Sequence, residues 1–228
     1  KRHVTLHRDT LVELNVKIAE TSFLIDNVVV TANKYETKQK EVATIVNIVS
    51  PLIISSTTSN SMADVLNFQT GLRVEETCSN CGVPQIRING LEGQYTQILM
   101  DSRPIFSSLA SVYGLEQLPA GMVDRIEVIR GGGSALYGAN AIAGVVNIIT
   151  KEPNRNSLSI SNSSAFTQQG TYDINTSMNA SVVAENQKAG IFLFGVQRNR
   201  EHYDRDQDGY SDITHLNSTT VGFRSYFK

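Results

Sequence analysis

The sequence predicts an α+β domain followed by a series of antiparallel β-strands, and two patterns support this fold class. Residues 42–153 mix short β-prone runs with a capped helical stretch. In residues 171–183 apolar and polar residues alternate strictly, the period of two that is typical of strands with one covered face. With 228 residues, of which 40% are hydrophobic, the chain can bury a core, which excludes a disordered tail and a disulfide-stapled mini-protein.

The first 41 residues contain too few elements for a domain. Short strands are expected at residues 3–7 and 11–18, and two strands alone are marginally stable. The apolar run 28–32 follows, before a polar stretch at 33–41. This run is either a further strand of a small N-terminal domain or a strand on a solvated tether, available to a partner that pairs by β-augmentation.

Residues 42–153 are expected to hold most of the secondary structure. A helix is predicted over 59–68, with Ser59 or Ser61 as its N-cap and Gly71 at the C′ position. A short helical turn is expected at 115–118. Strands are predicted at 46–49, 72–75, 85–88, 96–100 and 123–129.

Residues 131–150 form an uncharged stretch of 20 residues, which is long enough for a membrane-spanning helix. Five glycines and two asparagines argue against that interpretation, because such a helix would be weak and poorly buried. The glycine-rich string at 125–138 is not a nucleotide-binding loop either. The dinucleotide-binding motif requires glycine or alanine where Leu136 stands, and the phosphate-loop motif requires lysine where Ala139 stands. Successive glycines instead suit a sharp turn.

Beyond residue 153 the pattern predicts four antiparallel strands of about ten residues each, the strand length of a transmembrane barrel. Turns are expected at 168–170 and 185–189, and a long loop at 198–213. A soluble meander with one solvated face fits the same pattern. Because four strands cannot close a barrel, we expect the sequence to end inside an architecture that it has begun.

Charge and side-chain chemistry exclude two further classes of function. Lys and Arg number 20 against 22 Asp and Glu, so no basic surplus exists for nucleic acid. No nucleophile stands in a pattern with a base, so no enzyme is predicted. Glu127, between Arg125 and Arg130, is interpreted as a structural ion pair.

An acidic loop has the spacing of a calcium site. Its oxygen donors at positions 1, 3, 5, 7 and 9 would be Asp204, Asp206, Asp208, the carbonyl of Tyr210, and Asp212. His215 at position 12 excludes an ordinary EF-hand, which requires a bidentate glutamate there. The alternative is a solvated acidic turn. Calcium is favoured because four carboxylates this close would otherwise repel one another.

Cys78 and Cys81 form a C-x-x-C pair. The four histidines lie in other segments, which disfavours a four-ligand zinc site, and Gly82 to Pro84 disfavours the helix start of a thioredoxin-like site. We therefore expect a structural disulfide that closes a loop in an oxidising compartment.

Five motifs, in order along the chain, resemble the plug domain of TonB-dependent outer-membrane receptors. They are RINGLEG at 87–93, QILMDSRP at 97–104, YGLEQLP at 113–119, RIEVIRGGGSALYG at 125–138 and NAIAGVVNIIT at 140–150. The plug sequence is most similar to receptors for heme and cobalamin from Bacteroidetes. The resemblance implies an α+β plug domain followed by antiparallel β-strands of an incomplete transmembrane β-barrel.

The resemblance also implies a division of the chain into four parts. Residues 1–25 are similar to the end of a carboxypeptidase-regulatory-like β domain, and 26–41 to a TonB box and tether. Residues 42–153 would be the plug, and 154–228 the first four barrel strands with an extracellular loop. The residues implied to pair with the C-terminal domain of TonB are Val28, Val29, Val30 and Thr31.

The implied function is TonB-dependent active uptake of a metal chelate (heme, cobalamin or siderophore) across the outer membrane, with the plug gating the barrel. The implied partners are TonB, the chelate and, at full length, the outer membrane. Heme or cobalamin would be cargo, so no organic cofactor is expected, and Ca²⁺ in the 204–212 loop is the expected ion. A calcium-dependent surface-binding or adhesion module without transport is the alternative.

Overall fold

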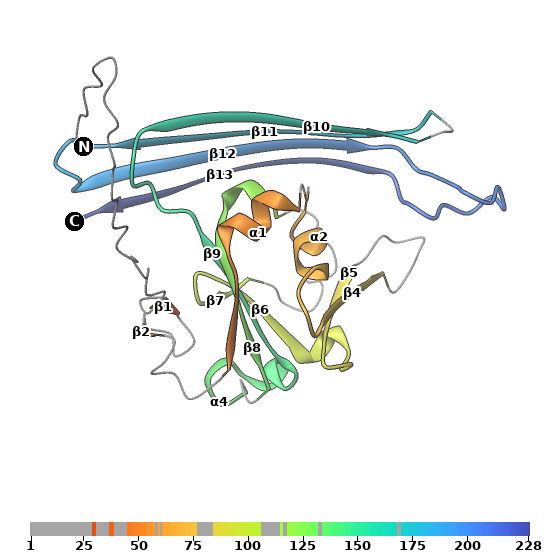
Figure 1. Cartoon of the computed structure of the whole chain (residues 1–228), viewed down its shortest axis with the longest axis horizontal. Helices are drawn as coiled ribbons and strands as arrows, with labels where there is room; N and C mark the ends of the chain where they lie inside the picture. The colour runs from red at the N-terminus through yellow and green to blue at the C-terminus, as the bar shows by residue number, and fades with distance from the viewer. Residues whose placement is uncertain are drawn as a thin grey trace, which may run out of the picture.

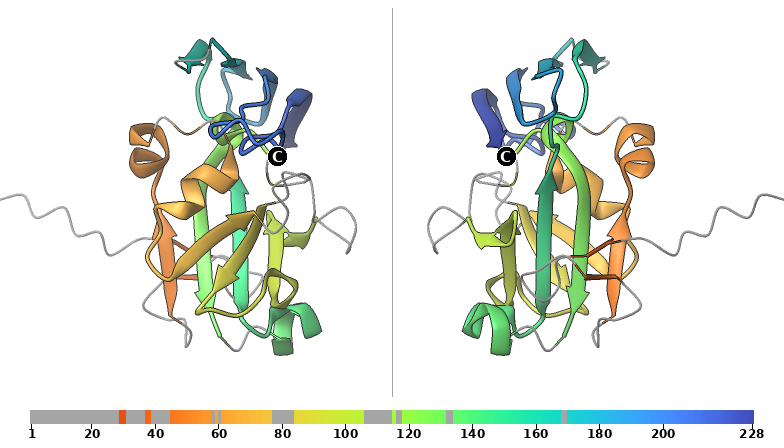
Figure 2. Two further views of the ribbon diagram at one scale, coloured as in Figure 1. Left: turned by 90° about the vertical axis from the view of Figure 1, so that its right-hand side faces the viewer. Right: turned by 90° about the vertical axis from the view of Figure 1, so that its left-hand side faces the viewer.

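The computed structural model describes residues 29–30, 37–38, 45–57, 59, 61–76, 84–105, 115, 118–131, 134–167 and 170–228. Two parts are evident in Figure 1: an α/β unit formed by residues 45–153, and a long four-stranded sheet that runs along one side of it. Figure 2 shows this long sheet end-on above the α/β unit. The predicted fold class, an α+β domain followed by antiparallel strands, is confirmed.

The α/β unit is built on a five-stranded sheet of order β3-β8-β9-β6-β7. The strands are β3 (Val46–Val49), β6 (Thr96–Met100), β7 (Arg103–Pro104), β8 (Val123–Arg130) and β9 (Gly144–Thr150). All neighbours pair antiparallel except β6 and β9, which are parallel. Every residue of β9 is buried, so the run of β-branched residues there forms the centre of the core.

A second, two-stranded sheet pairs β4 (Leu72–Glu76) with β5 (Pro84–Ile88). Alternate residues of β5 are buried, as the alternating pattern of its sequence requires. Two 3₁₀ turns lead into strands of the larger sheet: η2 (Gly93–Tyr95) precedes β6, and η3 (Ala120–Met122) precedes β8.

Two short helices pack against the sheets: α1 contacts β8 of the five-stranded sheet, and α2 contacts β4 and β5. The helix α2 (Met62–Asn67) begins at Ser61 with a capping box: the Ser61 hydroxyl accepts a hydrogen bond from the Asp64 amide (3.3 Å), and the Asp64 carboxylate accepts one from the Ser61 amide (3.2 Å). Its buried residues are Met62, Ala63, Val65 and Leu66. The helix α1 (Pro51–Ser56), capped by Ser50, was not predicted.

The helix predicted over 59–68 is present with shorter bounds, and one of its two candidate N-caps is confirmed. Ser61 rather than Ser59 is the N-cap, and Phe68 is the C-cap, so Gly71 is not the C′ residue. Gly71 has a φ of +77° in the turn that enters β4, and the guanidinium of Arg130 lies against it. The positive φ favours glycine at this position, since other residues rarely adopt it.

The uncharged stretch 131–150 forms the short helix α4 (Ser134–Tyr137), the 3₁₀ turn η4 (Ala139–Ala141) and the buried strand β9. Among the described residues, no helix is long and apolar enough to cross a membrane. The prediction that this stretch is not a membrane helix agrees with these elements.

Glu127 on β8 is fully buried and pairs with Arg125 (3.0 Å) as predicted, whereas Arg130 donates to the carbonyl of Thr70.

The long sheet is a meander of four antiparallel strands. They are β10 (Ser157–Phe166), β11 (Tyr172–Val183), β12 (Ala189–Arg200) and β13 (Leu216–Phe227). All four were predicted, but the loop expected from residue 198 begins later. Arg198 is paired with Asn175 and Ser218 in the sheet, and its guanidinium forms an ion pair with Asp173 (2.7 Å), which accommodates the charge within the strand.

The two faces of the long sheet differ in chemistry. The face turned away from the α/β unit is exposed. Where it is in register with the first residues of β10 it is mostly apolar, with Leu158, Ile160, Met178, Leu193, Val221 and Phe223. The face turned toward the α/β unit carries serine and asparagine on β10 and β11, and Phe192, Phe194 and Arg224 on β12 and β13.

Of the segment predicted as a strand at 28–32, β1 (Val29–Val30) is described, and it pairs with β2 (Thr37–Lys38). The strands expected at 3–7 and 11–18 lie outside the described residues, as does the pair Cys78 and Cys81.

Candidate functional site

An aromatic side chain of the long sheet is part of the hydrophobic core of the α/β unit. Phe192 on β12 is 5% exposed and belongs to the same cluster as Met122, Val146 and Ile148. Phe194 packs against that cluster, with its ring centroid 6.0 Å from that of Phe192. The two parts of the molecule therefore share one core on the β12 side.

Beside this aromatic contact lies a cluster of charges. Arg224 on β13 forms ion pairs with Asp101 (3.1 Å) and Glu152 (2.6 Å), and donates a hydrogen bond to the carbonyl of Thr150 (3.0 Å). Asp101 is fixed in turn, because its carboxylate accepts from the amide (3.0 Å) and hydroxyl (2.7 Å) of Thr150. The cluster ties the β6–β7 turn and the end of β9 to the long sheet.

Asp101 and its neighbour Ser102 both have positive φ values, 47° and 66°. Hydrogen bonds hold the turn in this strained conformation. The Ser102 amide donates to the side-chain oxygen of Asn147 (2.9 Å), and the Asp101 carboxylate accepts from the Thr150 amide. Sequence reasoning missed both the Arg224 cluster and Phe192. Arg224 is a charged residue within an otherwise neutral strand, and that signal could have revealed a partner.

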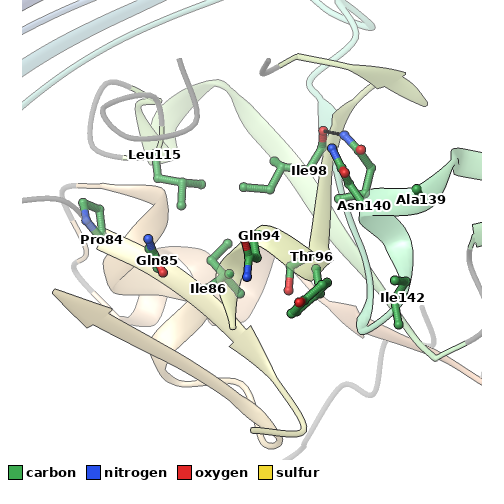
Figure 3. Close-up of a pocket in the computed structure, with 13 residues that line it drawn as sticks. Pro84, Gln85, Ile86, Gln94, Thr96, Ile98, Leu115, Ala139, Asn140 and Ile142 are labelled. Carbon is green, nitrogen blue, oxygen red and sulfur yellow. Dashed lines mark hydrogen bonds between the residues drawn. The ribbon is translucent and has the colours of Figure 1, made fainter. Parts of the chain in front are cut away.

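A pocket of about 600 Å³ opens in the α/β unit between β5, η2, β6 and η4 (Figure 3). Its buried lining includes the apolar side chains of Ile86, Ile98 and Leu115, and Thr96 and Gln97 are buried as well. Amides and hydroxyls surround them, from Gln85, Gln94, Tyr95, Thr96, Gln97 and Asn140. None of the lining residues is charged, so the pocket offers hydrogen bonds without a net charge.

The acidic loop brings three of its predicted ligands together. One carboxylate oxygen each from Asp204, Asp206 and Asp208 lie within 4.8 Å of one another. The loop is folded around Asp204, whose two oxygens accept from the amides of Gln207 (2.7 Å) and Gly209 (3.0 Å). Three hard oxygen donors at this separation can hold Ca²⁺.

The other two predicted ligands have different surroundings. The carboxylate of Asp212 accepts from the amide of Arg205 (2.8 Å) and is outside the triad, and the side chain of Tyr210 is exposed. A bridge between Tyr203 and Ile213 closes the base of the loop. The loop is therefore folded by its own hydrogen bonds, with Asp206 and Asp208 exposed and Asp204 partly buried next to its base.

The predicted TonB-binding residues are only partly visible. Val29 and Val30 form β1, opposite Lys38 and Thr37 of β2. Val28 and Thr31 lie outside the described residues.

Lys151 is a titratable group with a shifted pKa at the junction of the two parts. Burial lowers the pKa of its ammonium below the usual 10.5, and the nearby charge of Asp124 opposes this shift. Its Nζ donates to the carbonyl of Gly121 (2.8 Å), which fixes the side chain against η3.

A compact α/β unit shares its core with one face of a long antiparallel meander, which is the arrangement of a folded plug beside part of a barrel wall. Residues 38–145 match the family model described as TonB-dependent Receptor Plug Domain. The chain therefore contains a TonB-dependent receptor plug domain, followed by antiparallel strands that align with the first part of the barrel in solved receptors. These receptors are non-enzymatic proteins of the outer membrane, which agrees with the localisation and the absence of enzyme activity expected from the sequence.

The chain is similar to two proteins of Vibrio vulnificus that are named vitamin B12 transporter BtuB. With that of strain CMCP6 it is 36% identical over 125 residues, which are 55% of this chain and 20% of the relative. With that of strain YJ016 it is 29% identical over 196 residues, which are 83% of this chain and 31% of the relative. The chain thus spans less than a third of the length of these relatives.

Solved structures share the fold. The siderophore receptor PirA from Acinetobacter baumannii superposes with a TM-score of 0.67 at 23% identity, over 83% of this chain and 30% of that protein. The unliganded ferric citrate transporter FecA gives a TM-score of 0.66 at 20% identity, over 83% of this chain and 29% of that protein. The bacterial phylum expected from the resemblance stays a prediction.

Proposed function

We propose that the receptor to which this chain belongs imports a metal chelate (heme, cobalamin or siderophore) across the outer membrane, driven by TonB. One observation carries the proposal: a plug-family domain leads directly into strands of the barrel and is fixed to their inner face. Relatives named vitamin B12 transporters and structures titled as siderophore receptors support a chelate as the cargo.

We assign coupling to the segment Val28, Val29, Val30 and Thr31, within a tether at 26–41. The short β1–β2 pairing supports this assignment, because it shows that Val29 and Val30 adopt the extended conformation that pairing with a TonB strand requires. Residues 1–25 are assigned to the end of a preceding β domain, 42–153 to the plug and 154–228 to the first four strands of the barrel.

The test uses the full-length receptor in cells with and without TonB. Deletion of residues 28–31 is expected to abolish energised uptake of labelled cyanocobalamin, heme or an iron siderophore while equilibrium binding to the receptor is retained. The matched control deletes four tether residues, 33–36, and should keep most uptake. Uptake that survives the first deletion, or that does not depend on TonB, contradicts the proposal.

We further propose that the triad Asp204, Asp206 and Asp208 binds Ca²⁺. The proximity of the three carboxylates supports a divalent cation, and the exposed position of the loop predicts modest affinity. Because Tyr203 and Tyr210 belong to the loop, terbium bound there should show tyrosine-sensitised emission that Ca²⁺ displaces. Asp206→Asn should abolish this emission, and Glu185→Gln in a distant turn should leave it unchanged.

The alternative is a calcium-dependent surface-binding module without transport, which the same triad favours. The uptake test separates the two functions. An adhesion module would lose surface binding on removal of calcium and show no dependence on residues 28–31.

A further inference from the structure

The pocket between β5, η2, β6 and η4 contains a buried hydroxyl without a partner. Thr96, the first residue of β6, lines this pocket and is 7% exposed. Its Oγ1 is buried and has no hydrogen-bond partner among the described residues. Because a buried hydroxyl that makes no hydrogen bond is unfavourable, the pocket is suited to a ligand that donates or accepts one there.

The rest of the lining combines apolar side chains with side-chain amides. Both kinds face the same cavity in Figure 3, the apolar ones from Ile86, Ile98 and Leu115 and the amides from Gln85, Gln94 and Asn140. A volume of about 600 Å³ is in the range of small-molecule sites. Since an amide both donates and accepts hydrogen bonds, this lining matches a ligand that presents amide or hydroxamate groups on an apolar frame.

The electrostatic surroundings of the pocket disfavour an anion. No lysine or arginine is found among the described residues that line it. The Nε2 of Gln94 donates to the carboxylate of Glu92 (2.9 Å), so a charge in contact with the lining is negative. In the sequence, residues 77–83 before β5 and 106–114 before Leu115 contain no charged residue. An anionic group bound here would meet no cation to offset its lost hydration, which makes its burial costly.

The pocket is formed at the end of the plug that the proposed receptor turns outward. β4 and β5 lie at the same end of the molecule as the loop between β12 and β13 (Figure 1), and the left view of Figure 2, taken from that end, shows them in front of the five-stranded sheet. That loop is extracellular in the proposed receptor. One wall of the pocket, β5, therefore lies on the side from which cargo arrives.

We propose that this pocket, which we call the amide pocket, binds an uncharged part of the cargo that carries amide or hydroxamate groups, so that the receptor selects neutral chelates over anionic ones. The Thr96 hydroxyl is the specificity-determining group, because the cargo supplies its missing hydrogen bond. This inference rests on the proposed uptake function and narrows it. A corrinoid with amide arms and a neutral hydroxamate siderophore fit the pocket, whereas heme with its propionates and catecholate siderophores do not.

The first test compares the affinities of four chelates for the purified full-length receptor. Cyanocobalamin and ferrichrome are neutral, and the first carries amides and the second hydroxamates. Heme and iron–enterobactin are anionic. At least one neutral chelate is expected to bind about tenfold or more tightly than both anionic ones, because of the cost of burying an unpaired charge. Tighter binding of heme or iron–enterobactin overturns the inference, while the proposed uptake function remains.

The second test changes the pocket itself. Thr96→Val replaces the hydroxyl by a methyl group of similar size. It should weaken binding of the preferred chelate about fivefold, the loss of one hydrogen bond, without lowering the urea midpoint of the unliganded receptor, where the hydroxyl has no described partner. Unchanged affinity, or a lowered midpoint with unchanged affinity, overturns the role of Thr96.

A charge variant tests the selectivity. Asn140 lines the pocket and is exposed, so Asn140→Lys adds a cation at its edge. The affinity for heme and iron–enterobactin relative to the neutral chelate should rise about tenfold or more. Gln69→Lys, after α2 and outside the lining, is the matched control and should leave the ratio unchanged. Equal ratios in the two variants overturn the inference.

The third test shows whether the pocket is open in the complete receptor. The thiol of Asn140→Cys is expected to react with a hydrophilic maleimide, and the neutral chelate at saturation should slow this reaction about tenfold or more; the parent receptor, with Cys78 and Cys81, gives the background. A thiol that does not react without cargo shows that another part of the chain fills the pocket, and this overturns the inference, as does a thiol that cargo does not protect. Failure to bind any of the four chelates, or binding without TonB-dependent uptake, contradicts the proposed function instead.

Discussion

Phe192 provides the most direct test of how the plug is held. The side chain of a phenylalanine buries on the order of 150–250 Å², and truncation of a buried phenylalanine to alanine typically costs about 3–5 kcal/mol. Phe192 is 5% exposed, so nearly all of that burial applies. Because Phe194 lies beside it and can relax into the space, we expect Phe192→Ala to lose about 3 kcal/mol of plug docking, roughly a hundredfold in the docking equilibrium.

The assay is hydrogen exchange of the plug core in the purified full-length receptor, followed on peptides that cover β8 and β9. Docking stabilises these strands, so Phe192→Ala should accelerate their exchange by about the same hundredfold factor. Phe223→Ala is the matched control: this phenylalanine is on the adjacent strand, opposite Leu193, and is 69% exposed on the other face. If the two variants accelerate exchange equally, Phe192 does not anchor the plug and the reasoning is refuted.

Four further predictions follow from individual contacts, each measured as urea unfolding of the plug in the full-length receptor unless stated. Arg224→Met should destabilise plug docking by about 1 kcal/mol, because its ion pairs are partly exposed and screened, and the loss should shrink in high salt. Gly144→Ala should destabilise by about 3 kcal/mol or more, since an added Cβ would overlap the carbonyl oxygen of Ile129. Gly131→Ala, also at positive φ but in open space, should cost only about 1 kcal/mol, and equal effects would contradict the clash. Ser61→Ala should cost about 1 kcal/mol through loss of the α2 capping box, with Ser59→Ala near neutral. Because burial lowers the folded-state pKa of Lys151, its charged form is disfavoured in the folded protein. The stability of the wild type relative to Lys151→Met should therefore rise as the pH increases from the lowered pKa toward 10.5, and a flat difference would contradict the assignment.

The elements that could be predicted share a strong local pattern. β3 and β6 agree with the sequence residue for residue, and β11 follows from strict alternation of apolar and polar residues. The helix α1 was missed because Pro51–Ser56 has no helical repeat of apolar residues; its helix depends on the Ser50 cap and on the proline at its start. The end of β12 was misplaced because Arg198 is compatible with a strand only through Asp173, which lies 25 positions earlier.

The candidate sites divide in the same way. The acidic triad could be predicted because its ligands lie within five residues, so that one tight turn brings them together. The core contact of Phe192 and the pairing of Arg224 with Asp101 could not be predicted, because the partners are distant in the sequence. Arg224 and Asp101 are separated by 123 residues. No periodicity specifies such a pair.

The sequence alone determined the family resemblance, the order of most elements and the apolar face of β11, because motifs and alternation are local properties. Only the tertiary structure decided how the plug meets the barrel strands. The same face of the sheet carries serine and asparagine on β10 and β11 and phenylalanine on β12. Whether a strand borders a crevice or shares the core of the plug depends on what packs against it. That difference depends on contacts between segments distant in the chain, which packing in three dimensions alone establishes.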